Sequence, residues 1–104
     1  MAGEKILVID DTEVILTFLR KVLGEAGYEV DTALSGEEAL EKAHVKRYDL
    51  AFVDAVMPGM SGLETCKAIK AISPETIPIF MTGKLEGHVI EKEVAFIAGG
   101  GADL

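Results

Sequence analysis

Short apolar segments alternate with amphipathic segments along the chain, and this alternation is the feature that most restricts the possible folds. The apolar segments are rich in β-branched residues, which is typical of strands buried in a parallel sheet. The segments between them carry apolar residues at helical spacing, which is typical of helices that pack one face on a sheet. The pattern predicts strands over residues 5–9, 28–33, 49–53 and 77–82, and helices over 12–23, 36–45, about 63–73 and 89–98.

Strictly alternating strands and helices favour the α/β class, with an open, doubly wound parallel sheet covered by helices on both faces. At 104 residues the chain is long enough for one domain and too short for two. Its 49% of hydrophobic and 27% of charged residues are typical of a globular protein. We therefore expect one domain over residues 1–104.

The composition also restricts the partners. A net charge of -8 argues against direct nucleic-acid binding, which depends on clustered Lys and Arg, and it favours cationic partners such as a divalent metal ion. The single cysteine, Cys66, cannot form an internal disulfide and is most simply a core thiol. No segment has the length and apolarity of a signal or membrane helix, so we expect a cytoplasmic location.

Polar residues stand at the carboxyl ends of three predicted strands. Asp10 and Asp11 follow the first strand, Asp54 follows the third, and Thr82 ends the fourth. In open parallel sheets the functional crevice lies at the carboxyl ends of the strands, so these residues meet if the three strands are neighbours. Clustered carboxylates repel one another, and a hard divalent cation with oxygen ligands, such as Mg²⁺, compensates that repulsion. The pattern predicts a metal site where Asp54 attacks a phosphoryl group and Thr82 bonds its oxygens.

Each of these residues also has an ordinary structural interpretation. Asp10 or Asp11 could cap the first helix, Asp54 could be a turn residue before Pro58, and Thr82 could simply end a strand. The two histidines, His44 and His88, have no second metal ligand at a suitable spacing and are interpreted as surface residues. Ser35 and Glu38 form the pattern of a capping box at the start of the second helix, and Glu38 with Lys42 forms an i,i+4 pair.

The chain resembles the receiver domain of two-component response regulators. The matching stretches are "ILVIDD", "SGEEAL", "YDLAFVDAVMPGMSG", "IPIFMTG" and "AGGGADL", which together extend over the whole chain. The resemblance implies a flavodoxin-like fold with strand order 2-1-3-4. It also implies Asp54 as the phosphoacceptor, Thr82 as the switch hydroxyl, and a Mg²⁺ site made by Asp10, Asp11, Asp54 and the backbone carbonyl of Val56.

The resemblance implies further that a sensor histidine kinase or a histidine phosphotransfer protein supplies the phosphoryl group. The phosphorylated domain would then change its binding to a downstream effector, and it would be a signalling domain that assists its own phosphoryl transfer, not a turnover enzyme. Neither nucleic acid nor membrane is an expected partner of this chain.

The family pattern continues beyond this sequence into a fifth strand, which carries a lysine and an aromatic residue, and a fifth helix. Neither element has a match here, so we expect a domain that is incomplete at its C-terminus. An uncovered strand over residues 77–82 would then expose an apolar sheet edge, and a homodimer through this edge is one way to cover it.

Two other functions remain open at this point. The missing lysine makes a receiver-fold binding module without phosphorylation, completing its sheet by dimerisation, the main alternative. A phosphatase of the haloacid dehalogenase type is less consistent with the sequence, because that family has a D-x-D motif after its first strand and this chain has "DDT".

Overall fold

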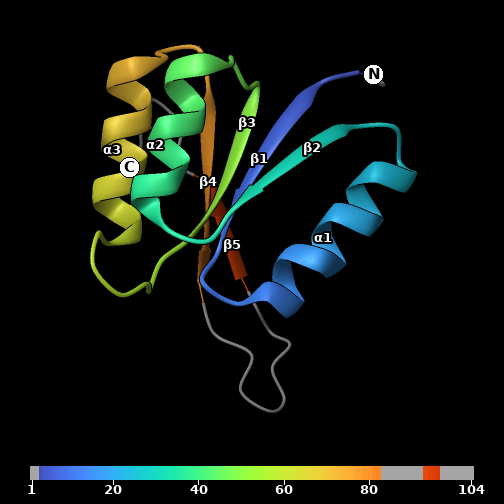
Figure 1. The fold of residues 1–104 in the computed structure, drawn as a ribbon, viewed down its shortest axis with the longest axis horizontal. Coiled ribbons are helices and arrows are strands. Elements are labelled where there is room, and N and C mark those ends of the chain that lie inside the picture. The colour runs from blue at the N-terminus through green and yellow to red at the C-terminus, as the bar shows by residue number, and fades with distance from the viewer. Residues whose placement is uncertain (1–2, 83–92, 97–104) are drawn as a thin grey trace.

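The computed structural model of the chain describes residues 3–82 and 93–96. Within them a five-stranded sheet has the order β2-β1-β3-β4-β5, and its first four strands are parallel. Figure 1 shows the helices α2 and α3 together on one face of this sheet and α1 on the other. The elements are β1 (Lys5–Ile9), α1 (Glu13–Glu25), β2 (Glu29–Ala33), α2 (Gly36–Val45), β3 (Leu50–Asp54), α3 (Gly62–Ile72), β4 (Ile77–Thr82) and β5 (Glu93–Phe96).

The central strands β1 and β3 are buried because apolar clusters lie on both faces of the sheet. Leu7 and Ile9 of β1 face the cluster under α2 and α3, with Ala51 and Val53 of β3. The alternate residues of β1 face the cluster under α1. This two-sided burial is the reason that these strands lack the polar alternation of a half-exposed strand.

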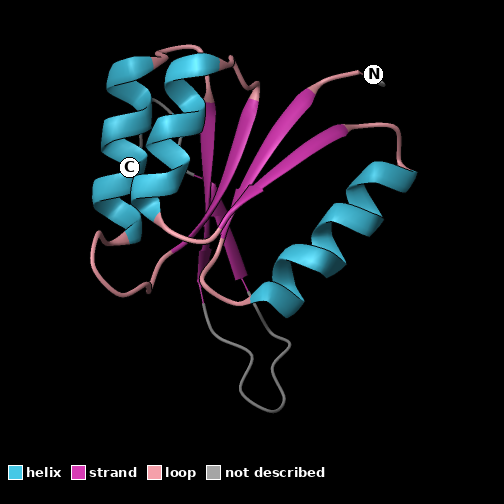
Figure 2. Ribbon diagram, in the orientation of Figure 1, coloured by secondary structure: helices cyan, strands magenta, loops and turns pink. Residues whose placement is uncertain are grey.

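On the other face of the sheet, α1 buries a narrow strip of its surface. Leu16 is its one fully buried residue. Val14, Phe18 and Val22 lie one helical turn apart on the same stripe and are 70%, 59% and 43% exposed. Figure 2 shows α1 as the one described helix on this side. The apolar surface of α1 is therefore wider than the described residues cover.

The predicted elements agree closely with the structure as far as β4. The strand order 2-1-3-4 is confirmed, and β1, β3 and β4 are neighbours. Ser35 caps α2 by accepting a hydrogen bond from the backbone of Glu38, as predicted. The carboxylate of Glu38 bonds the backbone N–H of Leu34 and not that of Ser35, so the reciprocal half of that capping box is absent.

The prediction of a helix over residues 89–98 is wrong at its centre. Glu93–Phe96 form β5, which runs antiparallel to β4 and pairs Ile79 with Phe96 and Thr82 with Glu93. The remainder of the predicted helix lies outside the described residues. A short segment such as Glu-Val-Ala-Phe fits a strand as well as a helix, and an available sheet edge decides between them.

This pairing also corrects the expectation of an open strand edge. β5 occupies the outer edge of β4 from Ile79 to Thr82, so those backbone groups are not free to pair with a second copy of the chain. The homodimer through that edge therefore loses its structural basis. In the described part of the chain, no helix has the length and apolarity needed to span a membrane.

Candidate phosphoacceptor and metal site

Parallel pairing brings the ends of β1 and β3 together at the carboxyl edge of the sheet. Ile9 pairs with Val53, so Asp10 and Asp54 follow at equivalent positions of neighbouring strands. The backbone on both sides is anchored: Asp10 N–H donates to the carbonyl of Ala33 at 3.1 Å, and Ala55 N–H donates to that of Met81 at 3.0 Å. The strands therefore hold the two aspartates by regular sheet hydrogen bonding.

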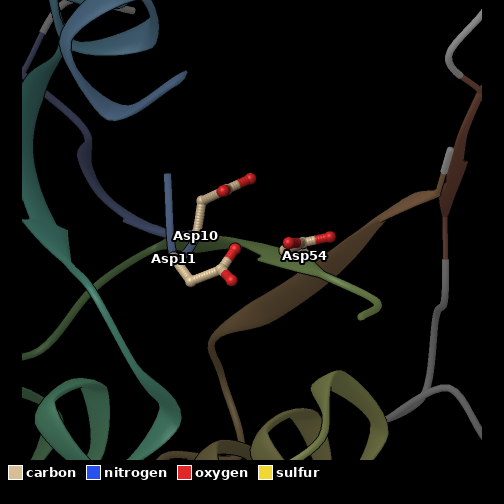
Figure 3. Close-up of side chains that lie close together, drawn as sticks. All are labelled: Asp10, Asp11 and Asp54. Atoms are coloured by element: carbon tan, nitrogen blue, oxygen red, sulfur yellow. The ribbon is translucent and has the colours of Figure 1, made fainter. Parts of the chain in front are cut away.

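Asp10, Asp11 and Asp54 form the acidic cluster predicted from the sequence. One carboxylate oxygen from each lies within 4.8 Å of the others. Figure 3 shows Asp10 and Asp11 in the segment after β1, across from Asp54 at the end of β3. Asp10 is 7% exposed and Asp54 is 4% exposed, whereas Asp11 is exposed to solvent. Two carboxylates of the cluster are thus buried, and the cluster is open to solvent on the side of Asp11.

Backbone N–H groups orient the two buried carboxylates. The N–H of Thr12 donates to Asp10 Oδ1 at 2.9 Å, and the N–H of Val56 donates to Asp54 Oδ1 at 3.3 Å. The residue at the N-cap of α1 is Thr12 itself, whose side chain makes no capping bond. The interpretation of Asp10 as the cap of α1 is therefore wrong. Asp10 accepts from the backbone of the N-cap residue and lies in the acidic cluster.

The donor set suits a hard divalent cation. Like charges at this separation repel by roughly 4 kcal/mol per pair at an effective dielectric near 20, so the cluster needs positive charge nearby. Carboxylate oxygens with one open side match Mg²⁺, which takes oxygen ligands and keeps several waters. The residues present therefore fit a divalent metal ion.

The segment that connects β3 to α3 forms the next part of the site. Val56 is 64% exposed, and Met57 beside it is buried in the cluster under α2 and α3. The segment ends at a capping box, in which Ser61 Oγ accepts from Glu64 N–H at 3.1 Å and the Glu64 carboxylate accepts from Ser61 N–H at 3.1 Å.

The sequence prediction missed this capping box. The signal is present as Ser61 followed three residues later by Glu64, the same pattern that identified the start of α2. Ser61 stands in the proline- and glycine-rich segment that follows Asp54, where turn residues rather than a helix start are expected.

Thr82 ends β4, beside β3. Asp54 pairs with Met81, so the backbone of Thr82 continues past the site, while its side chain lies outside what the structure describes. His44 is exposed, as expected, and His88 lies outside the described residues.

Cys66 does not belong to the site. It is 1% exposed in the cluster under α2 and α3, and burial raises the pKa of its thiol to about 11. The prediction of a core thiol is confirmed.

A second polar cluster lies on β2, the first strand in the sheet order. Tyr48 donates to Asp31 Oδ2 at 2.6 Å, and the ammonium of Lys46 lies 3.0 Å from that oxygen and 3.2 Å from Glu29 Oε2. Burial acts to raise the pKa of Asp31, but the Tyr48 hydroxyl and the Lys46 ammonium outweigh it and hold this pKa below its ordinary value. Burial and Asp31 raise the pKa of Tyr48. This cluster ties β2 to the segment before β3.

A parallel sheet of this order with acidic residues at its carboxyl edge is typical of the flavodoxin-like, doubly wound α/β class. The response regulator receiver domain family matches residues 6–100 of the chain. The chain belongs to this family.

Individual relatives support the membership of the chain in the receiver family. Transcriptional regulatory protein ResD of Bacillus subtilis is 40% identical over 95 residues, 91% of this chain and 38% of ResD. Sporulation initiation phosphotransferase F of the same organism is 36% identical over 92 residues, 88% of this chain and 74% of that protein. The crystal structure of response regulator protein TrrA from Thermotoga maritima, in complex with Mg²⁺-BeF, has 43% identity and a TM-score of 0.73, covering 78% of this chain and 70% of that one.

The chain is shorter than these relatives. It spans between 28% and 40% of the length of the Bacillus transcriptional regulators that it matches.

Proposed function

We propose that the chain is a phospho-accepting receiver domain over residues 1–104, with Asp54 as the acceptor. The observation that carries this proposal is the convergence of Asp10, Asp11 and Asp54 at the carboxyl edge of the sheet. The Mg²⁺-BeF complex of TrrA and the phosphotransferase name of the sporulation protein support it, because both relatives are linked to phosphoryl chemistry.

Asp54 is the nucleophile in this proposal. One of its carboxylate oxygens attacks the phosphorus of a phosphohistidine, the phosphorus–nitrogen bond breaks, and its electron pair returns to the imidazole of the donor. The N–H of Val56, 3.3 Å from Oδ1, orients the carboxylate for that attack. The burial of Asp54 at the end of a paired strand keeps the oxygen in place.

Asp10 and Asp11, with Asp54 and the backbone carbonyl of Val56, are the proposed ligands of Mg²⁺. When bound, Mg²⁺ would neutralise the carboxylates and attract the phosphoryl oxygens of the donor. Thr82 is the proposed switch hydroxyl, which would bond the phosphoryl group on Asp54.

We propose a sensor histidine kinase or a histidine phosphotransfer protein as the donor and an effector as the output partner. The added negative charge would change the equilibrium between two surface conformations and so change partner binding. In this role the domain assists its own modification and is not a turnover enzyme. The single buried thiol is compatible with a cytoplasmic location.

Incubation with acetyl phosphate and Mg²⁺, followed by intact mass measurement, tests the proposal. We expect one phosphoryl group per chain, lost in Asp54→Asn and retained in the control Glu41→Gln, which removes an exposed carboxylate of α2. A folded sample that binds Mg²⁺ and gains no mass would contradict phosphorylation and favour the binding module.

A further inference from the structure

The first residue of α3 lies directly against the backbone of Asp54. A Cβ atom at Gly62 would be 2.2 Å from the carbonyl oxygen of Asp54 and 2.8 Å from the Cα of Ala55. Both neighbours are backbone atoms of the strand end, so neither can rotate away as a side chain could. Gly62 does not have a positive φ angle, so the requirement for glycine here is one of space.

The same contact closes the segment between β3 and α3. The N–H of Gly62 donates to the carbonyl of Ala55 at 3.4 Å, which joins the two ends of the segment that contains Val56. The capping box of Ser61 and Glu64 holds the first turn of α3. Any side chain at Gly62 must therefore displace either a capped helix or the strand end that bears Asp54.

A second glycine, Gly36, allows α2 to pack closely against the start of α3. A Cβ atom at Gly36, the first residue of α2, would be 2.3 Å from Thr65 Oγ1 and 2.9 Å from Met60 Sδ. Thr65 is fully buried, and its hydroxyl donates to the Ser61 carbonyl at 2.8 Å. The start of α2 thus packs on the first turn of α3, which packs on Asp54.

We propose that Gly62 is a positioning residue for the acceptor site: the absence of its side chain lets α3 hold the Asp54 carboxylate in register with Asp10 and Asp11. This inference rests on the proposed function for the role of Asp54. Gly36 acts one layer further out, by letting α2 hold the first turn of α3. A side chain at Gly62 should therefore disturb Asp54 more than a side chain at Gly36 does, because only Gly62 contacts the backbone of Asp54 directly.

The test compares the Mg²⁺ affinity of Gly62→Ala with that of Gly24→Ala, by titration calorimetry at a temperature where both are folded. Gly24 lies in α1, and no described residue outside its own stretch of helix has an atom within 4 Å of an added Cβ, so it is the matched control. We expect Gly62→Ala to bind Mg²⁺ about tenfold or more weakly, the usual effect of disturbing groups that orient metal ligands. Gly24→Ala should bind as the wild type does.

A stability-matched variant separates positioning from general destabilisation. Leu16→Ala removes the buried side chain by which α1 packs on the opposite face of the sheet. It should lower the melting temperature without changing the Mg²⁺ affinity. A folded Gly62→Ala protein with an affinity within twofold of the wild type would overturn the inference. Wild-type protein that binds no Mg²⁺ would instead overturn the metal site of the proposed function.

If Gly62→Ala does not fold, Gly36→Ala provides the second test. Its added methyl group meets side-chain atoms of Thr65 and Met60 and no backbone atom among its three nearest neighbours, so we expect a smaller loss of stability than in Gly62→Ala. Mg²⁺ binding weaker than in Leu16→Ala supports the inference, and equal binding contradicts it.

Discussion

At the scale of single residues, burial separates the groups that serve the site from those that serve the core. Asp10 and Asp54 are buried carboxylates held beside one another by strand pairing, an arrangement in which their like charges repel. Cys66 is buried to a similar degree among apolar residues, and nothing in the described structure brings a charged group to it. Burial alone therefore does not identify a reactive group; the neighbours do.

The raised pKa of Cys66 predicts an unreactive thiol. With a pKa of about 11, little thiolate exists at pH 8, and burial blocks access. We expect maleimide labelling of the native protein at pH 8 to be at least 100-fold slower than labelling in denaturant, measured by mass. The free energy of unfolding is unaffected by this thiol below about pH 9 and falls as the pH rises from about 9 to about 11, because the thiol of the unfolded chain ionises first. Rapid labelling of folded protein would contradict the buried placement.

At the scale of elements, helix starts and strand ends build the site. The carboxyl ends of β1 and β3 supply the acids, and the start of α3 packs on the peptide of Asp54. The polar cluster on the edge strand β2 stabilises the sheet. There, Asp31 of β2 bonds Tyr48 and Lys46, which tie the edge strand to the segment before β3.

This edge contact predicts a pH dependence of stability. The pKa of Asp31 lies below its ordinary value in the folded chain. The ionised carboxylate therefore adds to the free energy of unfolding above about pH 4, and this stabilisation is lost as the pH falls through the folded pKa. Asp31→Asn should lower the free energy of unfolding by about 1–2 kcal/mol at pH 7, the lower part of the range for a hydrogen bond to a charged group, because the Asp31 side chain is 33% exposed to solvent. Urea unfolding should show this difference shrinking below pH 4; a constant difference would count against the ionised Asp31.

At the scale of the whole molecule, the acidic cluster couples metal binding to global stability. Mg²⁺ at 100 times its dissociation constant should raise the free energy of unfolding by about 2.7 kcal/mol, because it binds the folded chain. Without metal, Asp54→Asn should be more stable than the wild type by about 1 kcal/mol or more, since it removes one of the clustered charges.

Thermal melts with and without Mg²⁺ measure both effects. Glu41→Gln, with its exposed carboxylate outside the cluster, should respond to Mg²⁺ as the wild type does. A metal-free Asp54→Asn protein that melts below the wild type would mean that the three carboxylates do not repel in the native state.

Much of the site could be predicted from the sequence because its determinants are local. The residue after a buried parallel strand lies at the carboxyl edge of the sheet, so the positions of Asp10, Asp11 and Asp54 in the chain predicted their meeting. The periodicity that predicted α1 did not predict its buried strip, because Val14, Phe18 and Val22 repeat at the same spacing as the residues that pack on the sheet.

The sequence by itself determined the alternation of strands and helices, the strands that end in carboxylates, and the start of α2 with its Ser35 cap. Only the tertiary structure decided that residues 93–96 join the edge of β4 as a strand and that Gly62 must lack a side chain. The physical reason is the range of the interactions. Periodicity and capping act within a few residues, whereas the pairing of β5 and the contact of α3 with Asp54 depend on distant segments that the sequence does not place in space.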